Sequence, residues 1–240
     1  MAVSWQRLGN ARGGSISIGA NDSLWVAGAY FGKWDEEPQH WSDAPQAPDV
    51  PLAVAVSPDG RPWILTSGDA FQNNNIFEWD GASWQPRGGW GFHIAVGAND
   101  TVCHVGRGGA IYQYAGNNGW TVVPGAHVPT ADDVWNAGGL HRIAVDPQGG
   151  CWHIGRGSEI FRPSGGGWQG MGAWAQALSI GVHDEIIHVG RGNTIFILQN
   201  GRWACPYDDA WAIDVSIDSR SRCIHLGRGK AIFRQVIPLS

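Results

Sequence analysis

Apolar and polar residues alternate in short runs along the whole chain. Most runs span four to six residues, are rich in β-branched and aromatic side chains, and end at Asn, Asp, Gly or Pro. Alternation with a period of two, bounded by turn-forming residues, is typical of half-buried β-strands. Amphipathic runs with helical spacing are hard to find. The pattern therefore predicts an all-β protein made of short strands.

One of these runs recurs six times. It is an alternating apolar segment that ends in a tight turn, as in "SISIGAND" from Ser15 and "HIAVGAND" from His93. The first residues of the six turns are Gly19, Ser57, Gly97, Asp146, Gly181 and Asp218. They are 38, 40, 49, 35 and 37 residues apart, and the path from Asp218 through the C-terminus back to Gly19 takes 41 more. Six similar units thus fill the chain as a circle.

Each unit continues with a second strand, a Gly-rich loop, a third strand and a fourth strand that opens with tryptophan. These tryptophans are Trp5, Trp41, Trp84, Trp120, Trp168 and Trp203. Four short strands in about 40 residues are typical of a β-propeller blade. The alternative, an open solenoid or β-helix, has shorter repeats and needs polar caps at its ends.

The predicted fold is therefore a single six-bladed β-propeller spanning residues 1–240. The approximate blades are 10–45, 46–88, 89–124, 125–170, 171–206, and 207–240 together with 1–9. The last unit ends before an opening tryptophan, and "SWQRLG" near the N-terminus supplies one. We expect this N-terminal strand to complete the sixth blade, which would close the ring and leave fewer open sheet edges.

Four of the six units carry the sequence His-x-Gly-Arg-Gly. It places a histidine and an arginine at fixed positions: His104 and Arg107, His153 and Arg156, His188 and Arg191, His225 and Arg228. The first two blades have Val26 and Ile64 instead of the histidine, and Ala29 and Ser67 instead of the arginine. The glycines can be explained by turn geometry. The histidine and arginine need another explanation, because two blades do without them.

A tryptophan accompanies the motif in the same four blades. Trp90, Trp174 and Trp211 each precede the histidine by 14 residues, and Trp135 precedes it by 18. The first two blades lack this tryptophan as well. An indole face packs against the C–H face of a sugar or a methyl group, an arginine donates several hydrogen bonds, and a histidine adds another. The trio predicts a shallow site for a glycan, and repetition would increase avidity.

Some of these repeated residues can also be explained by the fold alone. The histidine and arginine could bond the backbone between blades, with different packing in the two blades that lack them. The six opening tryptophans, which occur in every blade, are interpreted as packing residues. Trp25, Trp63 and Trp152 share one strand position and are expected to pack between blades.

Charge and composition exclude several classes. The net charge of -5 does not provide the basic face of a general nucleic-acid binder, and no apolar run reaches the roughly 20 residues of a membrane span. The N-terminus has no basic and apolar leader, so we expect a cytoplasmic protein with four reduced cysteines. The histidines lie in separate blades without metal-ligand spacing, which predicts no metal and no cofactor.

No nucleophile motif is present, and His183, Asp184 and Glu185 are interpreted as a solvated turn. We therefore expect a binding protein and not an enzyme.

The repeat itself resembles a known family. The opening tryptophan, the "IAVG-x-N/D" turn and the "G-x-x-IY/IF" strand look like the tectonin repeat, over essentially the whole chain and most strongly in blades three, five and six. The resemblance to tectonin and tachylectin-like lectins implies a six-bladed propeller with carbohydrate sites between blades. It also implies a leaderless cytoplasmic lectin of innate defence that recognises O-methylated sugars or bacterial lipopolysaccharide.

We expect a multivalent lectin that uses the tryptophan, histidine and arginine of blades three to six. The expected partners are glycans or glycoconjugates, including bacterial or nematode surface sugars, without nucleic acid or membrane insertion; a homo-oligomer is left open. The alternative is a propeller that serves as a protein-interaction scaffold and binds no glycan.

Overall fold

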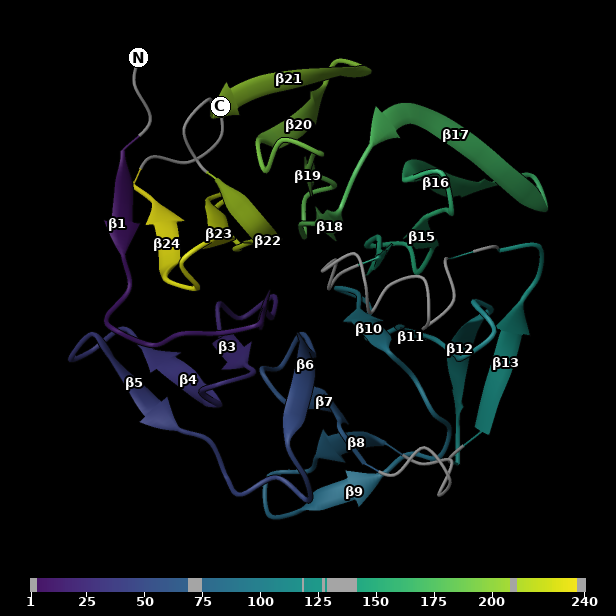
Figure 1. The fold of residues 1–240 in the computed structure, drawn as a ribbon. Helices are drawn as coiled ribbons and strands as arrows, with labels where there is room; N and C mark the ends of the chain where they lie inside the picture. The colour runs from purple at the N-terminus through teal and green to yellow at the C-terminus, as the bar shows by residue number, and fades with distance from the viewer. Residues whose placement is uncertain are drawn as a thin grey trace.

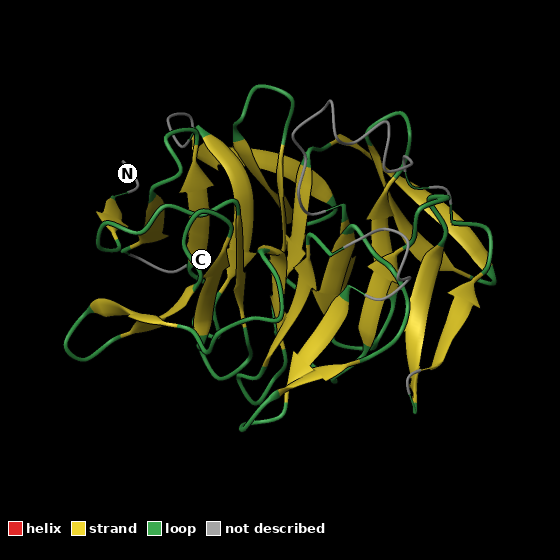
Figure 2. Ribbon diagram, turned by 60° about the horizontal axis from the view of Figure 1, so that its bottom comes forward, coloured by secondary structure: helices red, strands yellow, loops and turns green. Residues whose placement is uncertain are grey.

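The structure is a computed structural model and describes residues 4–68, 75–117, 119–126, 128, 142–207 and 211–236. Six four-stranded antiparallel sheets form a ring (Figure 1), and the described residues contain no helix. This confirms the six-bladed β-propeller. Figure 2 shows the sheets from the side, with loops joining the strands at both ends. No described segment is a helix with the length and apolar character that a membrane crossing requires.

The first three blades follow the chain in order. Blade one contains β2 (Ser15–Ile18), β3 (Leu24–Ala27), β4 (Gly32–Asp35) and β5 (His40–Asp43). Blade two contains β6 (Pro51–Val56), β7 (Pro62–Thr66), β8 (Ile76–Trp79) and β9 (Trp84–Pro86). Blade three contains β10 (His93–Val96), β11 (Val102–Val105), β12 (Ile111–Gly116) and β13 (Gly119–Val123).

The other three blades complete the ring. Blade four contains β14 (Ile143–Val145), β15 (Cys151–Ile154), β16 (Glu159–Ser164) and β17 (Gly167–Trp174). Blade five contains β18 (Ala177–Ile180), β19 (Ile186–Val189), β20 (Ile195–Gln199) and β21 (Arg202–Tyr207). Blade six contains β22 (Ala212–Ile217), β23 (Cys223–Gly227), β24 (Ile232–Gln235) and the N-terminal β1 (Trp5–Arg7).

The N-terminal strand closes the ring as the sequence predicts. β1 pairs antiparallel with β24, with Gln6 opposite Arg234 (Figure 1). The backbone N–H of Leu8 donates to the carbonyl of Ile232 at 2.9 Å, and the Leu8 side chain is completely buried. Backbone hydrogen bonds and an apolar anchor therefore join the two ends of the chain.

The turns between the first and second strands have the same geometry in all six blades. In blade three the N–H of Asp100 donates to the carbonyl of Gly97, and Asp100 has a φ of 66°. A residue with positive φ occupies this position in every blade: Asp22, Gly60, Asp100, Gly149, Asp184 and Ser221. Asp, Asn and Gly tolerate this conformation best, which explains the repeated turn sequence. We call the end of the propeller that carries these turns the inner-turn face.

The opening tryptophans join neighbouring blades, as expected of packing residues. Four of them donate the indole N–H to a backbone carbonyl in the outer strand of the preceding blade or just beyond it. These bonds run from Trp41 to Leu8, from Trp120 to Arg87 and Gly88, from Trp168 to Pro124, and from Trp203 to Met171.

The tryptophans of the second strands also pack across blade junctions, as expected. The ring of Trp63 lies 5.3 Å from that of Tyr114 and 6.5 Å from that of Trp120, both in the next blade. Trp25 reaches Trp84 of blade two through Phe31.

The expectation of four reduced cysteines is wrong for two of them. Cys103 of β11 and Cys151 of β15 form a disulfide that links blades three and four. Both residues belong to the same buried apolar cluster, where the two strands approach each other. Cys205 and Cys223 are not disulfide-bonded. Sequence spacing could not indicate this pair, because the partners are 48 residues apart and only the ring brings them together.

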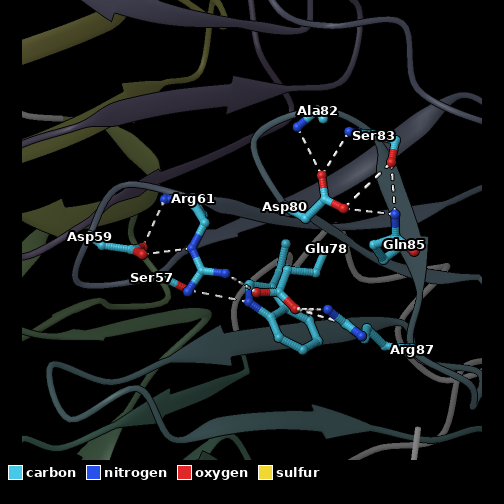
Figure 3. A network of polar contacts seen from close by, with 10 residues as sticks. Ser57, Asp59, Arg61, Glu78, Asp80, Ala82, Ser83, Gln85 and Arg87 are labelled. Carbon is cyan, nitrogen blue, oxygen red and sulfur yellow. Dashed lines mark hydrogen bonds and ion pairs between the residues drawn. The ribbon is translucent and has the colours of Figure 1, made fainter. Parts of the chain in front are cut away.

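A buried carboxylate in blade two anchors a charged network (Figure 3). One oxygen of Glu78 accepts from Arg61 at 2.8 Å, and the other accepts from Arg87 at 2.6 to 2.7 Å. Arg61 also binds Asp59 at 2.6 Å. Since both oxygens of Glu78 are engaged by guanidinium groups from neighbouring strands, the network has the form of a structural ion cluster.

Candidate functional site

The four motif histidines lie inside the blades. His104, His188 and His225 are 2% exposed and His153 is 3% exposed. Each ring stacks on an aromatic ring of the third strand and meets the opening tryptophan edge-on. In blade three His104 lies 5.0 Å from Tyr112 and 4.3 Å from Trp120. Blades four, five and six repeat this arrangement with Phe161 and Trp168, Phe196 and Trp203, and Phe233 and Trp5.

The expectation that His104, His153, His188 and His225 contact a ligand is therefore wrong. They occupy an interior position of the second strand, between two aromatic side chains. Burial disfavours the charged imidazolium and lowers the pKa of His104, His188 and His225 to about 4. The sequence held a signal for this placement, because Val26 and Ile64, the counterparts in blades one and two, are apolar and fully buried.

The arginines of the motif, in contrast, are all exposed at the turn between the second and third strands. In blade three the N–H of Gly109 donates to Gly106, and the N–H of Gly106 donates to Ala110. This is a three-residue hairpin loop with a positive-φ residue at its end. The same bonds and the same positive φ recur with Ser158, Asn193 and Lys230. Each arginine is thus placed at the same position of an identical turn.

Three of the four predicted tryptophan–arginine pairs are in contact. The guanidinium carbon of Arg191 lies 4.1 Å from the centroid of Trp174, that of Arg107 lies 4.8 Å from Trp90, and that of Arg228 lies 5.4 Å from Trp211. Distances within about 6 Å are those of cation–π contacts. In the fourth motif blade, Arg156 is exposed, and Trp135 lies outside the described residues.

Two of these tryptophans are unusually open to solvent. Trp174 and Trp211 are each 58% exposed, whereas Trp90 is partly buried. Large apolar side chains held on a surface commonly mark a binding site when they are arranged with polar neighbours. Arg191 and Arg228, which lie in blades five and six, contact the rings of Trp174 and Trp211 and leave much of each indole exposed to solvent.

The backbone holds Trp211 between blades five and six. Its neighbour Ala212 donates its N–H to the carbonyl of Asn193 at 2.7 Å and accepts from the Asn193 side chain at 2.9 Å. On the other side, the N–H of Arg228 donates to the carbonyl of Trp211 at 3.0 Å. Trp211 has a φ of 44°, which is costly for an aromatic residue and persists only where surrounding bonds impose it.

Trp174 is held in the same way between blades four and five. The N–H of Ala175 donates to the carbonyl of Ser158 at 2.7 Å, and the Gln176 side chain donates to the carbonyl of Arg191 at 3.0 Å. At Trp90, Asn75 of blade two forms two side-chain bonds to Gly91, both at 2.9 Å. These fixing residues were not predicted from the sequence. Ser158 and Asn193 directly follow Gly-Arg-Gly and contact the next blade, which was an available signal, whereas Gln176 and Asn75 follow no such motif.

Blades one and two carry other side chains at the tryptophan position. In blade two the N–H of Ser67 donates to the carbonyl of Val50, just as Arg228 donates to Trp211. In blade one the N–H of Gly13 donates to the carbonyl of Lys230, as the N–H of Ala212 donates to that of Asn193. Arg12, the residue before Gly13, is therefore the counterpart of Trp174 and Trp211. Each of these two junctions therefore keeps one of the backbone bonds seen at Trp211, without a tryptophan–arginine pair.

The residue types at these junctions suit binding of neutral or anionic hydroxylated ligands. Each pair offers an indole face and the donors of a guanidinium group. Within the residues described, no group of three or more His, Cys, Asp or Glu side chains could hold a metal ion.

No protein-family model and no curated protein matches the chain. Several solved propellers are similar in structure. Virginiamycin B lyase from Staphylococcus aureus is 13% identical, with a TM-score of 0.54 over 99% of this chain and 88% of the lyase. YCF48 bound to a D1 peptide is 15% identical, with a TM-score of 0.56 over 98% and 82%. A protein of unknown function from Bacteroides thetaiotaomicron is 10% identical, with a TM-score of 0.66 over 97% and 72%.

At these identities the similarity extends to the fold alone. The three neighbours include an enzyme and a peptide complex, so the propeller by itself does not specify an activity.

Proposed function

We propose that this chain is a multivalent carbohydrate-binding protein whose sites lie between blades. The observation that carries the proposal is the recurrent pairing of an arginine with a tryptophan at three described junctions. At the junctions of blades one and two, both members of the pair are replaced, while each junction keeps one of the two backbone bonds that hold Trp211. Since the fold does not need the pair, a ligand is the best explanation for keeping it.

The chemistry of the pair favours a glycan. The indole face binds the apolar C–H face of a pyranose or an O-methyl group, and the guanidinium donates to hydroxyl, carboxylate or phosphate oxygens. O-methylated sugars and bacterial lipopolysaccharide combine these features and are the glycans we propose. Recognition of bacterial or nematode surface sugars would serve a defence role.

Several equivalent sites on a ring also suit glycans, because individual sugar sites are weak. Linked sites raise the overall avidity through effective concentration, without any new contact. Trp90, Trp174 and Trp211 supply three such sites, and Arg156 marks the position of a fourth. Repeated shallow sites are better suited to binding than to catalysis, which calls for one asymmetric acid–base cluster.

The test is a glycan array that includes methylated and bacterial sugars, probed with the wild-type protein and with Trp211→Ala. We expect binding to defined glycans and a several-fold weaker signal for the variant. Asn193→Ala, which removes a bond that holds the Trp211 segment, should weaken the same glycans less. A blank array together with one defined protein partner in pull-downs would instead favour the interaction scaffold.

A further inference from the structure

A recess with a volume of about 380 Å³ lies between blades four and five. It is lined by residues of the inner turns, such as Gln148 and Asp184, and by Ser164 next to the turn between the third and fourth strands. In antiparallel blades these turns lie at the end opposite the arginine turns and the tryptophans. The recess therefore belongs to the inner-turn face and is separate from the proposed glycan sites. Its volume lies within the usual range of small-molecule pockets.

A missing aromatic ring explains why the recess exists. At the junction of blades two and three, Trp63 packs against Tyr114 of the following blade. At the junction of blades four and five, Trp152 is the counterpart of Trp63. Leu198 is the counterpart of Tyr114, because each of them lies opposite the opening tryptophan of its own blade: Trp203 for Leu198 and Trp120 for Tyr114. Leucine is shorter than tyrosine and carries no ring, so it leaves space beside Trp152 that adds to the recess.

Two other junctions on this face are bridged more firmly. Between blades five and six, Ser221 donates to Glu185, and His183 bonds the carbonyl of Ser219 at 3.1 Å. Between blades six and one, Arg234 forms an ion pair with Glu36. Across the recess, among the described residues, a long bond of 3.3 Å runs from the Gln148 side chain to Asp184.

Opposite charges lie at the rim of the recess. Arg162 donates two hydrogen bonds, of 3.0 and 2.7 Å, to a single oxygen of Gln169, which positions its guanidinium. Asp184 is exposed and accepts the long bond from Gln148. The side wall is fixed as well, because the indole N–H of Trp152 donates to Asp146 at 2.9 Å. The rim thus offers a positioned cation and an exposed carboxylate.

The floor of the recess is apolar. Ile180, Ile186 and Leu198 line it, together with Trp152 and Pro163. Four of these residues also belong to one apolar cluster of the blade junction. A ligand side chain of similar size would therefore exchange water for branched aliphatic surface.

We propose that this recess binds a small zwitterion with an apolar body, namely an amino acid or a dipeptide. Arg162 pairs with the ligand carboxylate, because guanidinium groups match carboxylate geometry. Asp184 pairs with the ammonium group, and an aliphatic side chain rests on Ile180 and Leu198. This proposal does not depend on glycan binding, since it uses other residues at the opposite end of the ring.

The test uses three probes: glycyl-leucine, N-acetylglycyl-leucine without the ammonium group, and glycyl-leucinamide without the carboxylate. Binding is followed by NMR through the indole N–H of Trp152, which is assigned with Trp152→Phe. We expect glycyl-leucine to give a saturable shift with a Kd of about 1 mM or below, which corresponds to a weak single site. Each modified probe should bind at least tenfold more weakly.

Three substitutions locate the site. Leu198→Tyr installs the residue found at the equivalent position of blade three and should abolish binding, whereas Leu198→Met should keep it. Arg162→Gln should weaken glycyl-leucine at least tenfold and leave glycyl-leucinamide nearly unchanged, which keeps the test decisive if Leu198→Tyr fails to fold. Absence of a shift at about 20 mM glycyl-leucine, equal binding of the three probes, or full binding by folded Leu198→Tyr would overturn the proposal.

Discussion

The guanidinium of Arg191 lies over the indole ring of Trp174, 4.1 Å from the ring centroid. Trp174 ends the outer strand of blade four, and Arg191 occupies a turn of blade five, so the contact crosses a blade junction. Separate hydrogen bonds fix the two partners: the N–H of Ala175 donates to the carbonyl of Ser158, and the Gln176 side chain donates to the carbonyl of Arg191. The pair is therefore a preorganised surface feature and not a product of chance proximity.

Trp174→Ala should lower glycan avidity and leave the fold intact. The side chain is 58% exposed, so its removal creates no internal cavity. An exposed cation–π contact contributes about 0.5 to 1 kcal/mol, and the melting temperature should change little. Titration on immobilised glycan, together with thermal unfolding, measures both effects. Trp203→Ala is the matched control: it removes an interblade hydrogen bond and packing, and should lower stability markedly.

The stability of the ring should fall in mild acid. Burial lowers the pKa of His104, His188 and His225 to about 4, whereas an unfolded histidine has a pKa of about 6.5. As the pH falls, the unfolded chain therefore binds protons before the folded one does. The free energy of unfolding should decrease between about pH 6.5 and pH 4, by up to about 2 kcal/mol per histidine from pH 7 to pH 5.

Urea denaturation at pH 7 and pH 5 measures this loss. His188→Ile places the blade-two residue at the same position and should reduce the pH dependence by about a third, since one of the three histidines no longer titrates. An unchanged pH dependence in this variant would contradict the assignment of the loss to the buried histidines.

Closure by the N-terminal strand predicts a large effect of Leu8→Ala. Leu8 is fully buried in a cluster with Ile16 of blade one and Ile232 of blade six. Removal of such a side chain costs about 2 to 5 kcal/mol, including the cavity left behind. Chemical denaturation should show this loss, whereas Arg7→Ala, at an exposed neighbouring position, should change stability by less than about 0.5 kcal/mol. Similar stabilities of the two variants would argue against a closed ring.

The network around Glu78 predicts that Glu78→Gln destabilises blade two. The substitution leaves Arg61 and Arg87 without their shared carboxylate, although both guanidinium groups remain partly solvated. We expect a loss of about 1 to 3 kcal/mol. Asp59→Asn, which removes an exposed partner of Arg61, should cost less than about 1 kcal/mol. An equal or larger loss for Asp59→Asn would show that the buried carboxylate is not the centre of the network.

The fold could be predicted almost completely from the sequence. Local sequence patterns determine the strands. They include the repeat length, the turn residues and the missing opening tryptophan at the C-terminus, and all three can be read from the sequence. The pairing of β1 with β24 followed from the count of strands in a circle. The disulfide between Cys103 and Cys151 could not be predicted, because it depends on the distance between blades.

The site was predicted in part. Blades one and two lack both the tryptophan and the arginine, and this joint absence predicted that the two residues act together. Contacts of Trp90, Trp174 and Trp211 with their arginines agree with that prediction. The histidines were expected to contact a ligand, because their co-occurrence with tryptophan outweighed the apolar residues Val26 and Ile64 at the same strand position; the structure buries them. Asn193 was missed because its role depends on a backbone carbonyl of the next blade.

The central claim is that the tryptophan–arginine pairs bind glycans. The most direct measurement compares the wild-type protein with a combined variant in which Arg107, Arg156, Arg191 and Arg228 are replaced by alanine, on one array of methylated and bacterial glycans. Arg220→Ala, at an exposed position of the inner-turn face, is the control. We predict that the combined variant folds and loses binding, while Arg220→Ala retains it. Undiminished binding by the folded combined variant would contradict the account.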